Sequence, residues 1–186
     1  MSAARWVRRL LLLLAIAAGV HLLMVWALPR VIMHKVLNTT PQELGAQPGS
    51  TAQVYFPPMT DATQRRIVMP SPDLLYATCV FDVSARPLRI RADPRLPGYW
   101  SVALYGANSD NFFVVNDRQL AGKPLDLVLV GARGAPEGTP LPAAARVVSV
   151  PSNRGLVLMR VLVADYAADR AVVEPARRTL SCEALR

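Results

Sequence analysis

Short apolar runs separated by turn-forming residues occupy the stretch from residue 71 to residue 117. The segments between these runs, such as 93–98 and 106–110, are rich in Pro, Gly, Asn, Asp and Ser, which favour turns. Strand-length apolar runs with turn signals about every 8–12 residues are typical of an antiparallel sandwich or barrel. The sequence therefore predicts a mainly β domain.

The same pattern continues toward the C-terminus. Residues 127–130 and 156–159 are apolar at consecutive positions and predict central strands that are covered on both faces. Residues 88–91 alternate between apolar and basic side chains, which predicts a half-exposed strand. A closing helix is predicted within 170–185, where Pro175 either lies in a first turn or breaks the helix in two. The later strands are placed at 125–130, 146–150 and 156–163.

The N-terminus carries a long apolar run, residues 10–28, whose only ionisable side chain is His21. At 1.5 Å per residue, this run spans close to the ~30 Å hydrocarbon core of a bilayer. A cleavable signal peptide would have an apolar stretch of about 7–15 residues with a small-x-small cleavage site after it. The exit from this run, Leu28-Pro29-Arg30, lacks that pattern. We expect a retained N-terminal transmembrane helix, followed by an antiparallel β-sandwich or barrel-like domain with a C-terminal helix.

Composition divides the chain into three parts. Residues 1–37 comprise a basic flank and the anchor helix, and residues 38–69 form an extended stalk rich in Pro and Gly. We expect residues 54–56 of this stalk to contact the globular domain. Residues 70–186 form the β domain, and their number is sufficient for one hydrophobic core.

The net charge of +8 does not indicate a nucleic-acid partner, because five of the 21 Lys and Arg residues flank the membrane span. The remaining basic residues are scattered and accompany no nucleic-acid-binding motif. The membrane itself is the partner that this charge favours. The excess of basic residues before the span favours a cytoplasmic N-terminus under the positive-inside rule. The globular domain is then expected outside, in a periplasm-like space.

Four short motifs follow one another in the β region. They are Pro72-Asp73-x-x-Tyr76, Phe81-Asp82-Val83-Ser84, Gly98-Tyr99-Trp100-Ser101 and Asn111-Phe112. Together they resemble the DUF1254 domain family over roughly residues 70–185, with a departure at Cys79. The resemblance implies a β-rich domain without a settled activity, often followed in the family by a DUF1214 domain. This chain looks like a short, membrane-anchored form without that second domain. We expect it in the bacterial inner membrane, with a single span and a periplasmic domain.

Few residues of the chain can support catalysis. His34 is the one histidine outside the apolar run, which excludes a Ser-His-Asp or Cys-His arrangement. Two distant cysteines cannot supply the ligands of a zinc site, and no glycine-rich nucleotide-binding pattern occurs. Residues 108–111 with 116–117 could supply oxygen ligands to calcium, but these residue types favour turns, the interpretation that we adopt. We therefore expect no catalytic residue, no metal and no cofactor.

Aromatic and polar residues on neighbouring predicted strands form a candidate ligand site. Its members are Asp73, Tyr76, Tyr99, Trp100, Asn111 and Arg154. An aromatic wall with amides and an arginine could bind a sugar or an anionic envelope molecule. The alternative is that the aromatic side chains belong to the hydrophobic core. Arg160 lies within an apolar run and requires a partner, such as Asp82 or Asp165.

The two cysteines, Cys79 and Cys182, predict a disulfide if the domain is exported, because an oxidising compartment favours their pairing. In the chain-entropy model, a bridge that closes so long a loop stabilises the fold by ~4 kcal/mol. The alternative is two free, buried thiols.

Three hypotheses for the function follow from these observations. The first is a membrane-anchored, non-enzymatic interaction or assembly module, whose partner is a protein with a DUF1214 domain or a second copy of this chain. The second is a small-ligand binding module that uses Tyr99, Trp100 and Asn111. The third is a subunit of an enzyme whose site is shared with the partner. It ranks last because the chain lacks nucleophile–base pairs.

Overall fold

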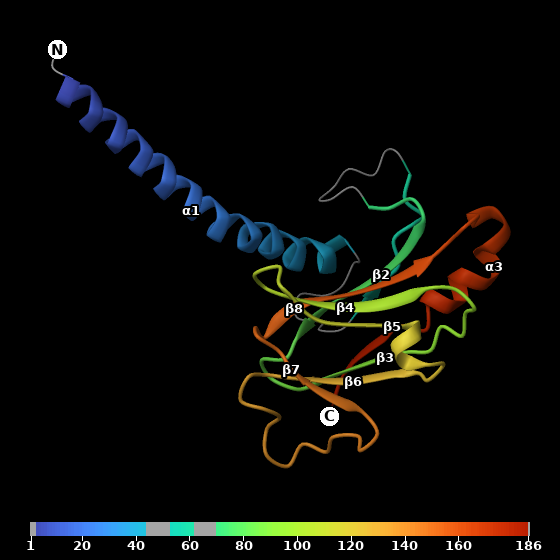
Figure 1. Ribbon diagram of the computed structural model, residues 1–186. Coiled ribbons are helices and arrows are strands. Elements are labelled where there is room, and N and C mark those ends of the chain that lie inside the picture. The colour runs from blue at the N-terminus through green and yellow to red at the C-terminus, as the bar shows by residue number, and fades with distance from the viewer. Residues whose placement is uncertain (1–2, 44–52, 62–69, 186) are drawn as a thin grey trace.

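The structure is a computed structural model that describes residues 3–43, 53–61 and 70–185. Its globular part is a sandwich of two β-sheets, from which one long helix projects (Figure 1). The mainly β fold class predicted from the sequence is confirmed. The helices are Ala3–Glu43 (α1), Asp117–Leu120 (α2) and Tyr166–Arg177 (α3). The strands are Val54–Tyr55 (β1), Leu74–Asp82 (β2), Leu88–Ala92 (β3), Trp100–Gly106 (β4), Asn111–Asn116 (β5), Leu125–Val130 (β6), Arg146–Ser149 (β7), Arg154–Leu162 (β8) and Ser181–Ala184 (β9).

The five-stranded sheet has the strand order β1-β2-β8-β4-β5. β2 and β8 pair antiparallel along their full length, and both bury every second residue. β4 pairs with the other edge of β8, so β8 lies at the centre of the sheet as predicted. The expectation that residues 156–159 are covered on both faces is wrong, because only every second residue of β8 is buried. β1 pairs with β2 opposite Cys79 and Thr78, which confirms the expected contact of residues 54–56 with the domain.

The four-stranded sheet has the order β7-β6-β3-β9 and departs from the predicted antiparallel pattern in one strand. β3 pairs antiparallel with β6 and β9, but β7 runs parallel to β6. A parallel pair requires a long connection, which residues 131–145 provide between these two strands. β3 buries Leu88 and Ile90 and turns Arg89 and Arg91 outward, which confirms a half-exposed strand.

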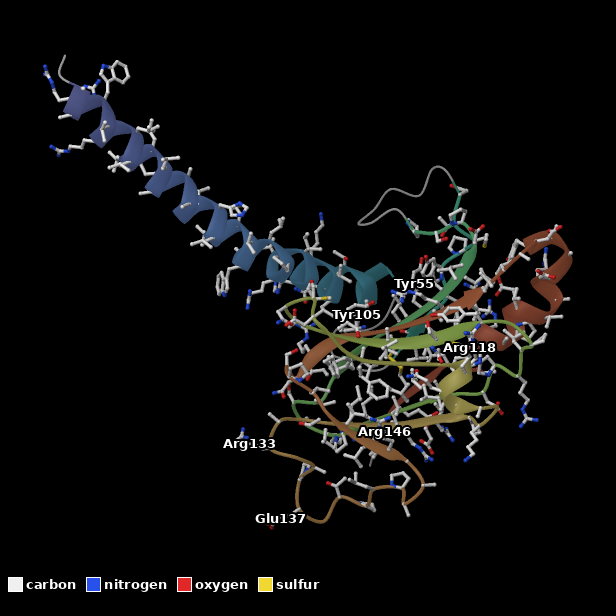
Figure 2. The ribbon with its side chains drawn as sticks, in the orientation of Figure 1. Tyr55, Tyr105, Arg118, Arg133, Glu137 and Arg146 are labelled. Atoms are coloured by element: carbon white, nitrogen blue, oxygen red, sulfur yellow. A yellow bond between two sulfur atoms is a disulfide. The ribbon has the colours of Figure 1, made fainter. Side chains whose placement is uncertain are left out.

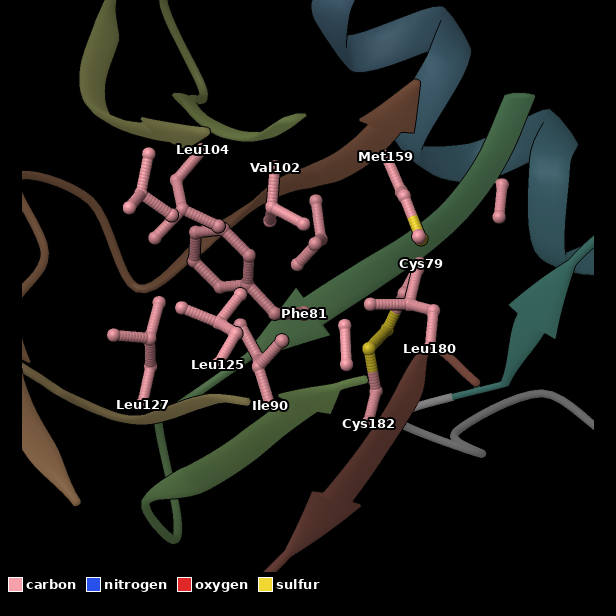
Figure 3. Close-up of a cluster of buried hydrophobic side chains, with 14 of the residues drawn as sticks. Cys79, Phe81, Ile90, Val102, Leu104, Leu125, Leu127, Met159, Leu180 and Cys182 are labelled. Atoms are coloured by element: carbon pink, nitrogen blue, oxygen red, sulfur yellow. A yellow bond between two sulfur atoms is a disulfide. The ribbon is translucent and has the colours of Figure 1, made fainter. Parts of the chain in front are cut away.

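The hydrophobic core lies between the two sheets. Phe81 and Leu104 enter it from the five-stranded sheet and face Ile90 from the four-stranded sheet (Figure 3). The predicted disulfide is confirmed: Cys79 of β2 is bonded to Cys182 of β9. Their Cα atoms are 6.7 Å apart, within the range that a disulfide allows. The bridge therefore joins one sheet to the other.

The helix α1 is long and apolar enough to cross a membrane. Its apolar run is exposed, whereas Met33 and Leu37 are buried where the helix reaches the domain. The helix continues through Pro29 and ends at Glu43 rather than near residue 37. Residues 38–43, which we expected to begin an extended stalk, are therefore helical. Residues 44–52 and 62–69 of the predicted stalk lie outside the described residues.

The C-terminal segment departs from its prediction at both ends. The Asp165 carboxylate accepts hydrogen bonds from two backbone N–H groups of the first turn of α3, and this cap starts the helix at Tyr166. Pro175 lies inside the last turn of α3. Residues 181–184 form β9, whose backbone pairs with β3. The helix predicted within 170–185 is therefore wrong over its second half, because pairing to the sheet edge satisfies that backbone instead.

Candidate functional site

The outer face of the five-stranded sheet is mostly apolar. Along β2, β4, β5 and β8, alternate residues point into the core, and the residues between them form what we call the outer sheet face. Its main aliphatic members are Leu74, Val80, Val114, Leu156, Leu158 and Leu162. Val114 and Leu162 are 53% and 46% exposed, and the other four are half-buried. This face therefore presents apolar surface beside the point where α1 meets the domain.

Arg160 lies in the middle of the outer sheet face, opposite Tyr76 on β2 and Ser101 on β4. Its Nη2 donates a hydrogen bond of 2.9 Å to the hydroxyl of Tyr105, which is labelled on β4 in Figure 2. The Ser101 hydroxyl is buried and has no hydrogen-bond partner among the described residues. The face thus combines an apolar surface with a cation and an unsatisfied hydroxyl.

Neither carboxylate that we expected to pair with Arg160 does so. The alternation along β2 places Asp82 at the far end of that strand, where it lies 3.7 Å from Arg154. Asp165 is occupied in capping α3. Within the described ranges, no carboxylate lies at ion-pair distance from Arg160. Its positive charge is therefore balanced by no acid in that part of the chain.

The structure divides the six predicted ligand-site residues between two ends of the five-stranded sheet. Asp73 and Tyr99 flank the end of β8, where the N–H groups of residues 163 and 162 donate hydrogen bonds to their respective carbonyl groups. Tyr76 lies nearby on the outer sheet face, and its hydroxyl accepts a hydrogen bond of 2.9 Å from the Ser71 N–H. Trp100 points the other way and packs in the core, where it is 5% exposed.

The two remaining members lie at the opposite end of the sheet. Asn111 is exposed and pairs with Tyr105 at the β4–β5 hairpin. Arg154 begins β8 and contacts α1. The structure therefore brings Asp73, Tyr76 and Tyr99 to one end and Asn111 and Arg154 to the other. The role of all six in binding a ligand stays a prediction.

The C-terminal part of α1 docks beside the start of β8. The Ser109 hydroxyl donates a hydrogen bond of 3.0 Å to the Pro29 carbonyl. Arg154 Nη2 donates to the helix backbone at 3.3 Å and to Asn38 Oδ1 at 3.2 Å. Because an arginine can only donate, the Asn38 oxygen must face it, and the amide nitrogen then faces His34 Nε2 at 2.9 Å. These contacts fix the helix against the domain.

A cavity of about 720 Å³, which we call the junction cavity, lies between α1 and the domain. Arg30, Val31, His34 and Leu37 form its wall on α1. Residues 107–108 and 151–152, together with Arg154, form the facing wall. None of the described residues that line it is acidic. The junction cavity is therefore a partly apolar site with two guanidinium groups.

Close packing of two loops shapes the domain wall of this cavity. A Cβ atom on Gly106 would lie 3.0 Å from Asn108 Oδ1 and 3.2 Å from Ser152 Oγ. The Ala107 N–H donates a hydrogen bond of 2.8 Å to Ser152 Oγ. The Asn108 side-chain amide donates to Asp110 within the hairpin turn, whereas Asn111 begins β5, and Asn116 and Asp117 lie at the start of α2 rather than in a turn.

A largely buried ion pair within α3, which the sequence analysis missed, includes the arginine that links α3 to the five-stranded sheet. Arg177 is 3% exposed and donates two hydrogen bonds of 2.8 Å to Glu174, one to the Pro57 carbonyl at 2.6 Å and one to the Tyr76 carbonyl at 2.9 Å. Desolvation by burial acts to raise the pKa of Glu174, but hydrogen bonds from Arg177 and Tyr166 outweigh it and lower the pKa. The hydrogen bond to Glu174 raises the pKa of Tyr166. The i,i+3 spacing of Glu174 and Arg177 was the available signal, whereas the two carbonyl partners are distant in sequence.

Two features of the described domain are candidate sites, the outer sheet face and the junction cavity. In the part of the chain that the structure describes, no group of three or more His, Cys, Asp or Glu side chains could hold a metal ion. Both candidate sites present arginine beside apolar surface.

Comparison with known proteins places the fold but supplies no activity. No curated protein matches the chain. The chain is similar to the crystal structure of the VPA0106 protein from Vibrio parahaemolyticus, with a TM-score of 0.64 and 17% identity over 87% of this chain and 36% of that one. An uncharacterised protein from Burkholderia cenocepacia gives a TM-score of 0.47 and 16% identity over 84% of this chain and 40% of that one. The chain thus spans little more than a third of the length of these structures.

The sequence model of one protein family also matches. It is described as a protein of unknown function (DUF1254), and it matches residues 51–184, which include every strand of the sandwich. The resemblance inferred from four short motifs is therefore confirmed, and the chain belongs to the DUF1254 family.

Proposed function

We propose that this protein is a membrane-anchored, non-enzymatic interaction module of the bacterial cell envelope. In this proposal α1 is a retained span of the inner membrane, with the N-terminus in the cytoplasm and the β domain in the periplasm. The outer sheet face receives a partner protein that carries a DUF1214 domain. The partner contributes an apolar surface and a carboxylate that pairs with Arg160.

The observation that carries this proposal is the charge of Arg160 on an apolar face. Its hydrogen-bond partner among the described residues is the neutral Tyr105 hydroxyl, which leaves several of the five guanidinium N–H groups available. A cation surrounded by apolar side chains favours a carboxylate partner, because charge-assisted hydrogen bonds are about twice as strong as neutral ones. Leu162 and Val114 supply exposed aliphatic surface around it.

Two further observations support the proposal. The disulfide between Cys79 and Cys182 fits an oxidising compartment such as the periplasm. The Vibrio protein, whose fold is similar, contains a large part beyond the portion that this chain covers. In that protein a domain of this fold occurs together with additional structure, which supports a role for this domain in interaction.

Site-specific photocrosslinking in cells tests the partner. A photoreactive amino acid replaces Leu162 on the outer sheet face or, as a control, Val147 on the outer face of the other sheet; these residues are 46% and 49% exposed. We expect position 162 to crosslink to a DUF1214-domain protein and position 147 to give no such product. Replacing Arg160 by Met should weaken the crosslink by about tenfold, whereas Arg118→Met should not. A product with a second copy of this chain alone, equal products at both positions, or no product would contradict the proposed partner.

Reporter fusions test the topology. An enzyme that is active only in the periplasm, fused after residue 186, should be active, and the mature N-terminus should precede the apolar run. Activity of a cytoplasm-specific reporter would contradict the orientation. A mature N-terminus that begins after residue 18 would contradict the retained anchor.

A further inference from the structure

We propose that the junction cavity binds the phosphate group of an anionic phospholipid from the membrane that α1 enters. The inference rests on the retained anchor but not on the proposed partner, because the cavity and the middle of the outer sheet face are different surfaces. Three features carry it: the depth of the cavity relative to the membrane, the chemistry of its walls and its size.

The position of the cavity along α1 places it at the membrane surface. Arg30 follows the last residue of the apolar run by two positions, or ~3 Å, and His34 follows it by ~9 Å. The headgroup layer on each side of a bilayer is about 5–8 Å thick. Arg30 and Val31 therefore lie at headgroup level, with His34 at its outer boundary. Trp26, whose indole favours this interface, supports the same depth.

The cationic groups of the cavity suit a phosphate. Arg30 stacks on Trp26 with its guanidinium carbon 4.5 Å from the ring centroid, which holds it at the interface. Arg154 lines the facing wall on the domain, and its Nε forms an ion pair of 3.7 Å with Asp82, which is outside the lining. Planar guanidinium groups bind phosphate oxygens through paired N–H donors. A phosphate between α1 and the domain would therefore contact both sides.

Polar side chains connect the two walls of the cavity. Arg154 contacts the Asn38 amide oxygen, and the Asn38 amide nitrogen lies 2.9 Å from His34 Nε2. The Asn108 amide and the Ser152 hydroxyl also line the domain wall, where the hydroxyl donates a hydrogen bond of 2.9 Å to the Arg154 carbonyl. Asp110 accepts the hydrogen bond from Asn108.

The apolar part of the cavity distinguishes a lipid from a free anion. Val31 and Leu37 on α1 and Pro151 on the domain line the same space as the cations. A volume of about 720 Å³ is much larger than one phosphate requires and falls in the usual range of small-molecule sites. A glycerophosphate headgroup with the first carbons of its acyl chains would satisfy both kinds of wall.

The experiment uses the full chain in nanodiscs of phosphatidylcholine that contain a minority of photoreactive phosphatidylglycerol. Labelled peptides are identified by mass spectrometry. We expect label on residues 30–37 and on residues 106–110 or 151–154 of the wild type. Arg154→Gln should reduce that label by about tenfold, which corresponds to losing one charge-assisted hydrogen bond. Arg146→Gln, an exposed arginine on β7, is the matched control and should leave it unchanged.

A second pair of variants separates loss of the site from loss of helix docking. Val31→Trp fills the cavity without removing a charge or a docking hydrogen bond, and it should reduce the label as Arg154→Gln does. Val25→Trp, at a similarly exposed helix position outside the cavity, should not. Unchanged label in both Val31→Trp and Arg154→Gln would overturn the site.

Two further arms identify the source of the phosphate. Photoreactive phosphatidylcholine should label the junction much less than phosphatidylglycerol does, and inorganic phosphate should not displace the label. Equal labelling by the zwitterionic lipid, insensitive to Arg154→Gln, would show adventitious lipid contact and overturn the proposal. Displacement by inorganic phosphate would show that the cavity takes a free anion, which would also overturn it.

Discussion

The four-stranded sheet turns paired charges outward, whereas the five-stranded sheet turns aliphatic side chains outward around Arg160. On the four-stranded sheet, Arg89 donates hydrogen bonds of 2.8 and 2.6 Å to Asp126. Arg91 lies 3.3 Å from Glu183 on the same face. Each of these arginines has a carboxylate partner within its own sheet, while Arg160 has none among the described residues.

The difference indicates which of the two outer faces is stable in water without a partner. Paired, half-exposed charges are stable in water and require no further partner. An apolar face with an isolated arginine is more favourable when another surface covers it. The helix α1 already covers one end of the five-stranded sheet, and no described helix packs on the paired-charge face. The five-stranded sheet is therefore the side on which we expect assembly, and the following predictions test that division.

The largest effect on stability is expected for a residue of the hydrophobic core between the two sheets. Trp100→Ala should lower the free energy of unfolding by about 3–5 kcal/mol, because Trp100 is buried in the core. Tyr99→Ala, at the 39% exposed neighbouring position, should cost less than about 1 kcal/mol. Chemical denaturation of both variants measures the difference. Equal losses would show that the outer side of this sheet contributes to stability as much as the core.

The disulfide is expected to have the next largest effect, because it holds the two sheets together. Replacing Cys79 and Cys182 by Ala should lower the free energy of unfolding by about 2–4 kcal/mol. Thermal unfolding of the double variant, with and without reductant, measures this change, and the wild type under reductant should behave in the same way. Two reactive thiols in the exported, denatured wild type would contradict the bridge.

Ion pairs on the two sides should differ in their contribution to stability. Arg177→Met should cost about 3 kcal/mol, because it leaves Glu174 largely buried without its main partner. Arg91→Met removes a half-exposed pair on the four-stranded sheet and should cost less than about 1 kcal/mol. Denaturant midpoints of the two variants give the comparison. A larger loss for Arg91→Met would reverse our view of the charged face.

Glu174 and Asp126 should each make a smaller contribution, which appears as a pH dependence of stability. The pKa of Glu174 is lowered in the folded protein, and so is that of Asp126, where hydrogen bonds from Arg89 outweigh desolvation. A lowered carboxyl pKa stabilises the fold above the unfolded value and loses that effect as pH falls through the folded value. Stability should therefore decline as pH falls below about 4.5. Glu174→Gln and Asp126→Asn should each flatten this decline in denaturation curves measured across that range.

Local patterning was enough to predict much of the sandwich. The uninterrupted apolar run in β8 predicted a central strand, and the alternation in β3 predicted a half-exposed one. The cysteine count and the expected compartment predicted the bridge. The strand signals depend on residues that are adjacent in sequence. The disulfide could be predicted because the chain has two cysteines, which either pair with each other or stay free.

The missed features depend on contacts between distant segments. β9 is only four residues long, and its pairing with β3 is not visible in its own sequence. The partner of Arg160 was predicted by charge alone, whereas the sheet register places Tyr105 within its reach. The junction cavity combines residues of α1 with two loops of the domain, so no single motif could indicate it.

The position of the disulfide also affects what proteolysis can release. The bridge joins residues 103 positions apart and encloses most of the β domain in one covalent ring. The loop 131–145, with Arg133 and Glu137 labelled far from α1 in Figure 2, lies inside that ring and is largely exposed. A cut in this loop would leave the C-terminal fragment attached through Cys182 to the fragment that carries α1. Shedding of the nicked domain from the membrane would then require a reductant as well as a protease.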